Sequence, residues 1–234
     1  MLPDIAFVTL TNDGYVEYTE NCLQSLDRID CPLQLHSFCI GQRGCDYLNG
    51  KGRSCTLIKD DDDAHRQFQR YRTGNWSNIV YHKFVIIYEQ LLKHEYVCIT
   101  DGDIVFERAG FVQYLVDHIG ENEMLIQSEY IDAGRTDLCS GFMFIKSTEN
   151  TRQFFNPVYV EHKKNTVGWG DQMYVNNHKH KIRYQLLPVE LFPNGKYYYS
   201  HPTIQPFLIH FNWVVGHEKR AKMRKHGKWY AVGL

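Results

Sequence analysis

The stretch YVCITDGDIVF (residues 96–106) runs an apolar segment straight into Asp101 and Asp103, two aspartates separated by one glycine. The apolar run predicts a buried strand near the middle of a sheet. A carboxylate buried without a partner in an apolar setting costs several kcal/mol. The two carboxylates are therefore expected either to emerge into solvent at a turn or to meet a positive charge.

The segment before this strand has the spacing of a helix. Residues 77–94 begin with Ser77, a residue type that favours the N-cap. Apolar side chains then recur on one stripe, at Val80, Phe84, Ile87 and Leu91. A helix that leads directly into a buried strand is typical of α/β proteins.

The same alternation continues along the chain. Strands are predicted at 4–12, 33–41, 55–58, 95–100, 104–106, 124–129, 141–146 and 182–188 and at the start of 207–219. Helices are predicted after the first strand, at 77–94, near 110–119, and at 148–163 and 171–178. Residues 41–53 are predicted to form a Gly-rich loop, and 59–76 a charged connection. The alternation predicts an α/β fold with helices on both faces of one sheet, and nothing divides residues 1–234 into more than one domain.

Composition excludes several classes of protein. The net charge of −1 gives no support to a nucleic-acid or membrane partner, and no apolar run is long enough to span a bilayer. Seven cysteines without a C-x-x-C pair argue against a disulfide framework or a zinc site. The expectation is a cytoplasmic protein, unless the sequence is part of a longer form.

The Asp-Gly-Asp turn has the residue types of a metal site. Asp101 and Asp103 follow a predicted central strand, where open α/β sheets place their ligands. Gly102 lets the backbone bend so that both carboxylates face one ion, and carboxylate oxygens suit Mg²⁺ or Mn²⁺. A hydrogen-bonded turn is the alternative. The acidic run at 60–63 also contains D-x-D patterns, and it is predicted to be a solvated loop or a helix N-terminus.

A second polar cluster lies near the C-terminus. FLIHFNWVVGHEK (207–219) is an apolar strand followed by His210, Asn212, Gly216 and Lys219. A neutral imidazole can complete a divalent metal site. Gly216 permits close backbone approach, and Lys219 offers a charge to phosphate. Two carboxylates, an imidazole and a lysine together suit a metal-bound diphosphate.

Five motifs in this order resemble the nucleotide-diphospho-sugar transferases: YVCITDGDIVF, SGFMFIK, GWGDQMYVNN, ELFPNGKYY and HFNWVVGHEK. The chain is similar to retaining glycosyltransferases of the GT-A type, in particular the group that includes plant cell-wall xylosyl-, arabinosyl- and galactosyltransferases. The likeness covers residues 75–230 well and the first 60 in outline. A form without a membrane anchor is unusual beside the plant members, so the resemblance implies a microbial or viral enzyme, or one that lacks the membrane anchor of a longer form. Related enzymes carry H-x-x-G-x-x-K, whereas here five residues separate His210 from Gly216.

The resemblance implies a GT-A (Rossmann-like) α/β fold with a mixed, mostly parallel sheet. Its N-terminal half would bind the nucleotide and its C-terminal half the sugar and the acceptor. It implies a UDP-sugar donor and Mn²⁺, or Mg²⁺, held by Asp101, Asp103 and His210. The residues that would contact the donor are Thr9, Thr11, Asn12, Tyr15, Lys83, Asp101, Gly216 and Lys219. For Lys83, a solvated surface lysine is the alternative.

Asp171 is the candidate catalytic carboxylate, because sugar transfer passes through an oxocarbenium-like state that a carboxylate stabilises. It opens a predicted helix, so an N-cap role is equally open. Gln172 is expected to bond sugar hydroxyls. Ser140 and Gly141 are expected to contact the sugar or the acceptor. Trp169, Trp213 and Trp229 are expected to stack on sugar rings or uracil, and burial in the core is the alternative.

The sequence thus predicts a metal-dependent glycosyltransferase that acts, with retention, on a glycan or glycoprotein acceptor. One alternative is a phosphoester hydrolase that uses the same aspartates and His210 around one or two metals, although that site is short of bridging carboxylates. Another is an inactive transferase-like binding module. The basic segment 217–229 is expected to be a solvated helix face rather than a nucleic-acid site.

Overall fold

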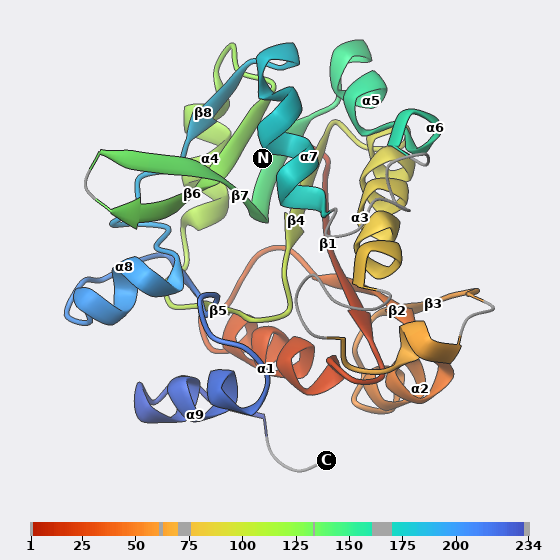
Figure 1. The fold of residues 1–234 in the computed structure, drawn as a ribbon, viewed down its shortest axis with the longest axis vertical. Helices are drawn as coiled ribbons and strands as arrows, with labels where there is room; N and C mark the ends of the chain where they lie inside the picture. Colours follow the sequence, from red (N-terminus) through yellow and green to blue (C-terminus); the bar gives the residue numbers. More distant parts are fainter. Residues whose placement is uncertain (1, 61–62, 70–75, 133, 161–169, 232–234) are drawn as a thin grey trace.

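The structure is a computed structural model, and it describes residues 2–60, 63–69, 76–132, 134–160 and 170–231 (Figure 1). A seven-stranded sheet contains, in order, β3 (Cys55–Ile58), β2 (His36–Ile40), β1 (Ile5–Asn12), β4 (Tyr96–Thr100), β7 (Arg135–Lys146), β6 (Met124–Asp132) and β8 (Tyr184–Leu186). Strands β3, β2, β1 and β4 are parallel, β7 is antiparallel to both of its neighbours, and β8 is parallel to β6. The predicted mixed, mostly parallel sheet is confirmed.

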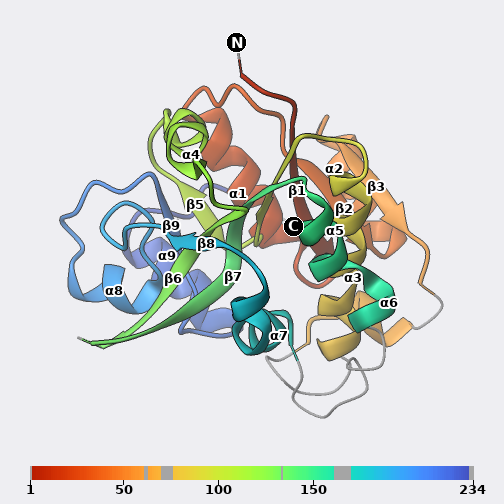
Figure 2. The ribbon, with the colours of Figure 1, turned by 90° about the horizontal axis from the view of Figure 1, so that it is seen from above.

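The two faces of the sheet carry separate hydrophobic clusters, because side chains alternate along a strand. In β4, Val97 and Ile99 belong to one cluster and Cys98 to the other. Helices α3 (Trp76–Leu91), α5 (Glu149–Phe155), α6 (Pro157–Val160) and α7 (Asp171–His178) cover the first, and α1 (Val16–Asp27), α2 (Gln42–Gly50) and α4 (Phe111–Ile119) the second. Figure 2 shows α3, α5, α6 and α7 on one side of the sheet and α1 and α4 on the other. The predicted two-sided α/β arrangement is confirmed.

A second, two-stranded sheet begins just after the Asp-Gly-Asp turn that ends β4. β5 (Ile104–Phe106) pairs antiparallel with β9 (Leu208–His210), and Ile104 lies opposite His210. Helix α9 (His217–Lys225) follows β9, and α8 (Gly195–Ser200) precedes it. The pairing brings two segments that are far apart in the sequence to one point. Within the described ranges, no helix is long and apolar enough to cross a membrane.

Local predictions fail where packing or proline overrides the pattern. Residues 41–53 contain helix α2 rather than only a loop, because Cys45 and Leu48 are buried at helical spacing. The predicted helix at 148–163 breaks before Pro157, where Asn156 is extended as the residue before proline prefers. Helix α3 already begins at Trp76, so Ser77 lies in its first turn rather than at the cap.

The acidic run at 60–63, predicted to be a solvated loop or a helix N-terminus, is only partly of that kind: Asp63 is exposed and begins a helix, whereas Asp60 is not solvated. The Asp60 carboxylate is buried, and its Oδ2 lies 2.8 Å from both His65 Nδ1 and His82 Nε2. Asp63 begins a short 3-10 helix, Asp63–Arg66. Asp60 therefore ties this connection to α3, while residues 61 and 62 lie outside the described ranges.

The apolar stripe of α3 packs in the first hydrophobic cluster, so a substitution there should change the free energy of unfolding. Phe84 is 1% exposed, and its ring centroid lies 5.0 Å from that of Tyr174. Phe84→Ala is expected to lower the free energy of unfolding by about 3–5 kcal/mol, because it leaves a cavity. Leu92→Ala, just beyond the same helix at 58% exposure, is the control and should change it by less than about 0.5 kcal/mol. Urea titration measures both, and equal effects would contradict this packing.

Candidate active site

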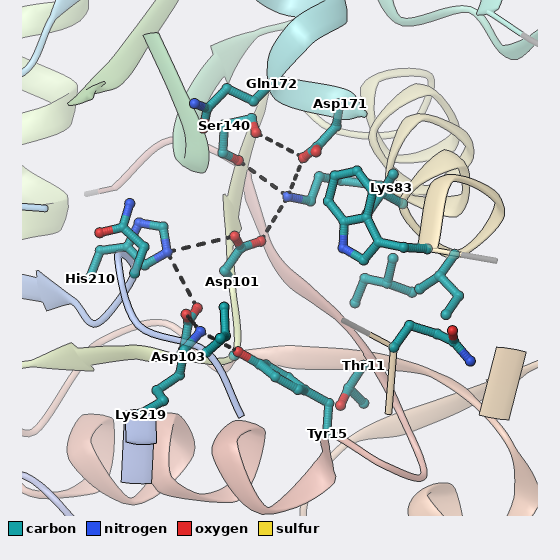
Figure 3. Close-up of a pocket in the computed structure, with 18 of the residues that line it drawn as sticks. Thr11, Tyr15, Lys83, Asp101, Asp103, Ser140, Asp171, Gln172, His210 and Lys219 are labelled. Carbon is teal, nitrogen blue, oxygen red and sulfur yellow. Dashed lines mark hydrogen bonds and ion pairs between the residues drawn. The ribbon is translucent and has the colours of Figure 1, made fainter. Parts of the chain in front are cut away.

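A pocket of about 560 Å³ lies at the carboxyl ends of β1 and β4. Its walls come from β1, α3, the Asp-Gly-Asp turn, β6, β7, α7 and the segment between β9 and α9. Figure 3 shows labelled side chains converging on it from β1, α3, the Asp-Gly-Asp turn, β7, α7, β9 and α9. The pocket lies where open α/β sheets bind ligands, as expected for Asp101 and Asp103.

Asp101, Asp103 and His210 form an acidic group with the geometry of a metal site. Their ligand atoms lie within 4.8 Å of one another, and His210 Nε2 is 3.3 Å from Asp103 Oδ1. The approach needs Gly141, since a Cβ there would lie 2.2 Å from His210 Cε1. Burial acts to lower the pKa of His210, but the two carboxylates outweigh it and raise the pKa. An oxygen-rich set with one imidazole suits Mn²⁺ or Mg²⁺.

Gln127 determines which nitrogen of His210 faces this group. Its amide nitrogen donates to the carbonyls of Phe192 and Pro193, at 3.1 and 3.0 Å. Gln127 Oε1 is therefore the acceptor, 2.9 Å from His210 Nδ1, which must carry the hydrogen. The lone pair of the neutral ring is left on Nε2, the nitrogen that faces the carboxylates. Metal-binding histidines have this kind of support, so the residues present fit a divalent ion.

Lys219 binds the second carboxylate of the turn. Its Nζ forms an ion pair with Asp103 Oδ2 and donates to Tyr15 Oη at 2.8 Å. Burial acts to raise the pKa of Asp103, but Lys219 and His210 outweigh it and hold the pKa well below its usual value. The preceding Gly216 also lines the pocket, with a φ of +55°. The longer spacing between His210 and Lys219 thus still brings both to Asp103.

Lys83 joins the turn to the candidate catalytic carboxylate. Its Nζ lies 2.7 Å from Asp101 Oδ1 and 2.6 Å from Asp171 Oδ2. Lys83 is only 5% exposed, so the solvated-lysine alternative is wrong. Burial acts to lower the pKa of Lys83, but the two carboxylates raise it, and the ammonium stays charged. Asp171 also accepts from Ser140 Oγ at 2.8 Å, and Lys83 holds its pKa low against the effect of burial.

The β1 end of the pocket has three of the four residues near the first strand that were expected to meet a nucleotide. Thr11, Asn12 and Tyr15 line it, whereas Thr9 is fully buried and does not. Asn12 Nδ2 donates to the carbonyls of His65 and Gln67, both at 2.9 Å. Within the described residues, Asn12 Oδ1 is left buried without a hydrogen-bond donor. A ligand N–H would satisfy this acceptor.

The remaining candidates separate into pocket and non-pocket positions. Gln172 and Trp213 line the pocket, while Trp229 packs on Tyr18 at 5.5 Å between ring centroids. Trp169 lies outside the described residues. Several pocket residues had not been singled out from the sequence: Phe68, Trp76, Ile79 and Glu129. A glutamate in an otherwise strand-like run was the available signal for Glu129.

Comparison with known proteins places this arrangement in a family. A family model for nucleotide-diphospho-sugar transferases matches residues 42–225. The chain belongs to this family. The UDP-galactose:fucoside alpha-3-galactosyltransferase of Dictyostelium discoideum is 29% identical over an alignment that covers 95% of this chain and 42% of that protein. The chain therefore spans less than half the length of this curated relative.

Solved structures of glycosyltransferases share the fold of this family member. Galactosyltransferase LgtC, in complex with donor and acceptor sugar analogs, matches with a TM-score of 0.62 and 12% identity over 97% of both chains. A glycosyltransferase involved in glycosylation of the major capsid of PBCV-1 matches with a TM-score of 0.58 and 12% identity, over 94% of this chain and 99% of that one. The predicted GT-A-type fold is confirmed. The narrower likeness to plant cell-wall transferases stays a prediction.

Within this transferase domain, Gln127 gives a prediction about metal affinity. Gln127→Met keeps the volume but removes the acceptor for His210 Nδ1, so Mn²⁺ binding is expected to weaken by about 10- to 100-fold. Titration of the metal-free protein, followed by electron paramagnetic resonance of free Mn²⁺, measures this directly. Gln113→Met on the exposed face of α4 is the matched control. A variant that is folded and binds Mn²⁺ as the wild type does would contradict the role of Gln127.

Proposed function

We propose that this domain transfers a sugar from a UDP-sugar to a hydroxyl of a sugar acceptor, with retention of configuration. The observation that carries the proposal is the joint position of Asp101, Asp103 and His210 beside Lys219 in one pocket. These three residues would hold Mn²⁺ or Mg²⁺, which when bound supplies charge neutralisation for the diphosphate leaving group. Lys219 would add a second positive charge at the same place.

The β1 end of the pocket supports a uridine. Uracil carries an N–H, and the buried Asn12 Oδ1 needs a donor. Tyr15 and Phe68 stack with their ring centroids 6.1 Å apart at the same end of the pocket, which gives an aromatic surface for a flat base. A bound base would thus find both a polar and an apolar partner.

Asp171 would act on the sugar as a fixed negative charge. Its Oδ2 accepts from both Lys83 and Ser140, which holds the carboxylate in place and lowers its basicity. A poorly basic carboxylate is a weak nucleophile but still stabilises a developing positive charge at the anomeric carbon. We therefore assign it electrostatic stabilisation rather than covalent attack. Gln172, next to it on the pocket wall, would bond sugar hydroxyls.

The curated relative suggests which substrates to test first. That protein is described as acting on UDP-galactose and a fucoside, and it aligns with 95% of this chain. UDP-galactose is therefore the donor we propose, and a fucoside the first acceptor to try. The sugar and acceptor of this chain are the part of the proposal that rests on the relative alone.

The test begins with calorimetry of UDP binding, with Mn²⁺ and with EDTA. Metal-dependent binding is expected, followed by transfer from UDP-galactose to p-nitrophenyl fucoside in a chromatographic assay. Cleavage of bis-p-nitrophenyl phosphate tests the alternative function, a phosphoester hydrolase. Cleavage of that ester without UDP binding would replace the transferase assignment, and absence of both would favour an inactive binding module.

A further inference from the structure

One carboxylate in the pocket has a different environment from the others. Asp101, Asp103 and Asp171 each bind a lysine. Glu129 is 9% exposed, and its Oε2 accepts from the neutral amide of Asn212 at 3.1 Å. In the described part of the chain, the Glu129 carboxylate is thus bound by a neutral amide, whereas each of the three aspartates is bound by a lysine. A carboxylate that is not neutralised by a cation remains a strong acceptor for neutral donors such as hydroxyl groups.

The residue that follows Asn212 in the chain is an aromatic residue of the pocket wall with a strained backbone conformation. Trp213 is 48% exposed and lines the pocket, with a φ of +63° that is rare for a bulky residue. Such strain persists where the surroundings impose it, and it clusters at ligand sites. The N-terminus of α8 contacts this segment: Gly195 N–H donates to Asn212 Oδ1 at 2.7 Å, and Lys196 Nζ lies 5.1 Å from the Trp213 ring centroid.

Both residues lie on the side of the pocket away from the nucleotide end. In the sheet, β1 and β6 stand on opposite sides of β4, so Thr11 and Glu129 approach the metal group from opposite directions. Asn212, which contacts Glu129 and precedes Trp213, is two residues after His210. A molecule bound by Glu129 and Trp213 would therefore sit beside the metal group without occupying the uridine end.

We propose that Glu129 and Trp213 form an acceptor subsite for a pyranoside, an inference that rests on the function proposed above. The polarised C–H face of the sugar ring would lie on the indole, whose face is electron-rich. Hydroxyl groups along the ring edge would donate to the Glu129 carboxylate, which Asn212 holds in place. The pairing of an aromatic face with a carboxylate whose partner, among the described residues, is a neutral amide selects a neutral sugar over a phosphorylated or acidic acceptor, because Glu129 repels negative charge.

The test measures binding of glycosides directly, with and without UDP and Mn²⁺. The probes are p-nitrophenyl glycosides of fucose, galactose, glucose and xylose. Saturation-transfer NMR and calorimetry measure their binding. At least one is expected to bind the wild type, and Trp213→Leu and Glu129→Gln are each expected to weaken it by about tenfold or more, which equals about 1.4 kcal/mol. Trp213→Tyr should recover part of the affinity, because it restores an aromatic face. UDP binding should be unchanged in all three variants.

Matched controls lie outside the pocket. Tyr159→Leu removes an aromatic residue of similar exposure, 52%, on α6, and Glu149→Gln removes an exposed carboxylate at the start of α5. A wild type that binds UDP but none of the glycosides overturns the subsite and leaves the donor site standing. Glycoside binding that both pocket variants retain also overturns it. If the wild type does not bind UDP, the proposed function is contradicted instead. The glycoside titrations without UDP then still test the subsite.

Discussion

Asp171→Asn is expected to lower kcat by about 10³-fold, or about 4 kcal/mol of transition-state stabilisation, while UDP affinity stays unchanged. Asp171 is 5% exposed, and its Oδ2 lies 2.6 Å from Lys83 Nζ and 2.8 Å from Ser140 Oγ. Asparagine keeps this shape but removes the negative charge that an oxocarbenium-like state requires. Steady-state turnover of UDP-galactose gives kcat, and calorimetry gives the affinity for UDP with Mn²⁺.

Ser140→Ala is the graded control, because it removes one hydrogen bond to the same carboxylate and leaves its charge in place. Its effect on kcat should be about tenfold, the value expected for one hydrogen bond to a charged group. If Asp171→Asn turned over within tenfold of the wild type, Asp171 would not be the charge that stabilises the sugar. A variant that lost UDP binding as well would point to a structural role at the start of α7.

Asp103→Asn is expected to abolish the metal-dependent part of UDP binding, so that affinity with Mn²⁺ falls to the value measured with EDTA. Asp103 is 4% exposed and contacts both His210 and Lys219. Loss of the carboxylate removes one of the three proposed metal ligands and leaves the Lys219 ammonium without its ion-pair partner. An uncompensated buried charge costs about 3–5 kcal/mol, so the free energy of unfolding should fall as well.

Calorimetry and urea unfolding separate these two effects. Asp117→Asn, on the exposed face of α4, is the matched control and should change neither. Lys219→Met in the Asp103→Asn background should recover stability, since it removes the unpaired charge, but it should not recover metal dependence. UDP binding that still strengthens with Mn²⁺ in Asp103→Asn would place the metal elsewhere.

Much of the fold could be read from local patterns. The stripe at Val80, Phe84, Ile87 and Leu91 predicted α3, and all four are buried. The apolar run before Asp101 predicted the central strand, and α7 occupies the predicted 171–178. These patterns succeed because a buried helix or strand must repeat its apolar residues with the period of its own backbone. Where that repeat was short, as in α2, the prediction failed.

The site was predicted in its residue types but not in its connections. Lys83 is adjacent in sequence to core residue Phe84, so spacing alone could not separate a solvated lysine from one that reaches Asp101 and Asp171. Gln127 and Glu129 are two polar residues in one strand, and nothing local distinguishes their roles. The partners that define those roles lie on segments remote in the sequence, such as β9 and the residues that precede α8.

By itself, the sequence determined the α/β alternation and the placing of Asp101 and Asp103 at the end of a buried strand. Both follow from periodicity and from the high cost of burying a lone charge, which are properties of short segments. Only the tertiary structure decided how that cost is offset. Lys83 forms an ion pair with Asp101, Lys219 forms one with Asp103, and Gln127 accepts a hydrogen bond from His210. Those contacts depend on strand order and on the β5–β9 pairing, which bring together residues that no local pattern relates.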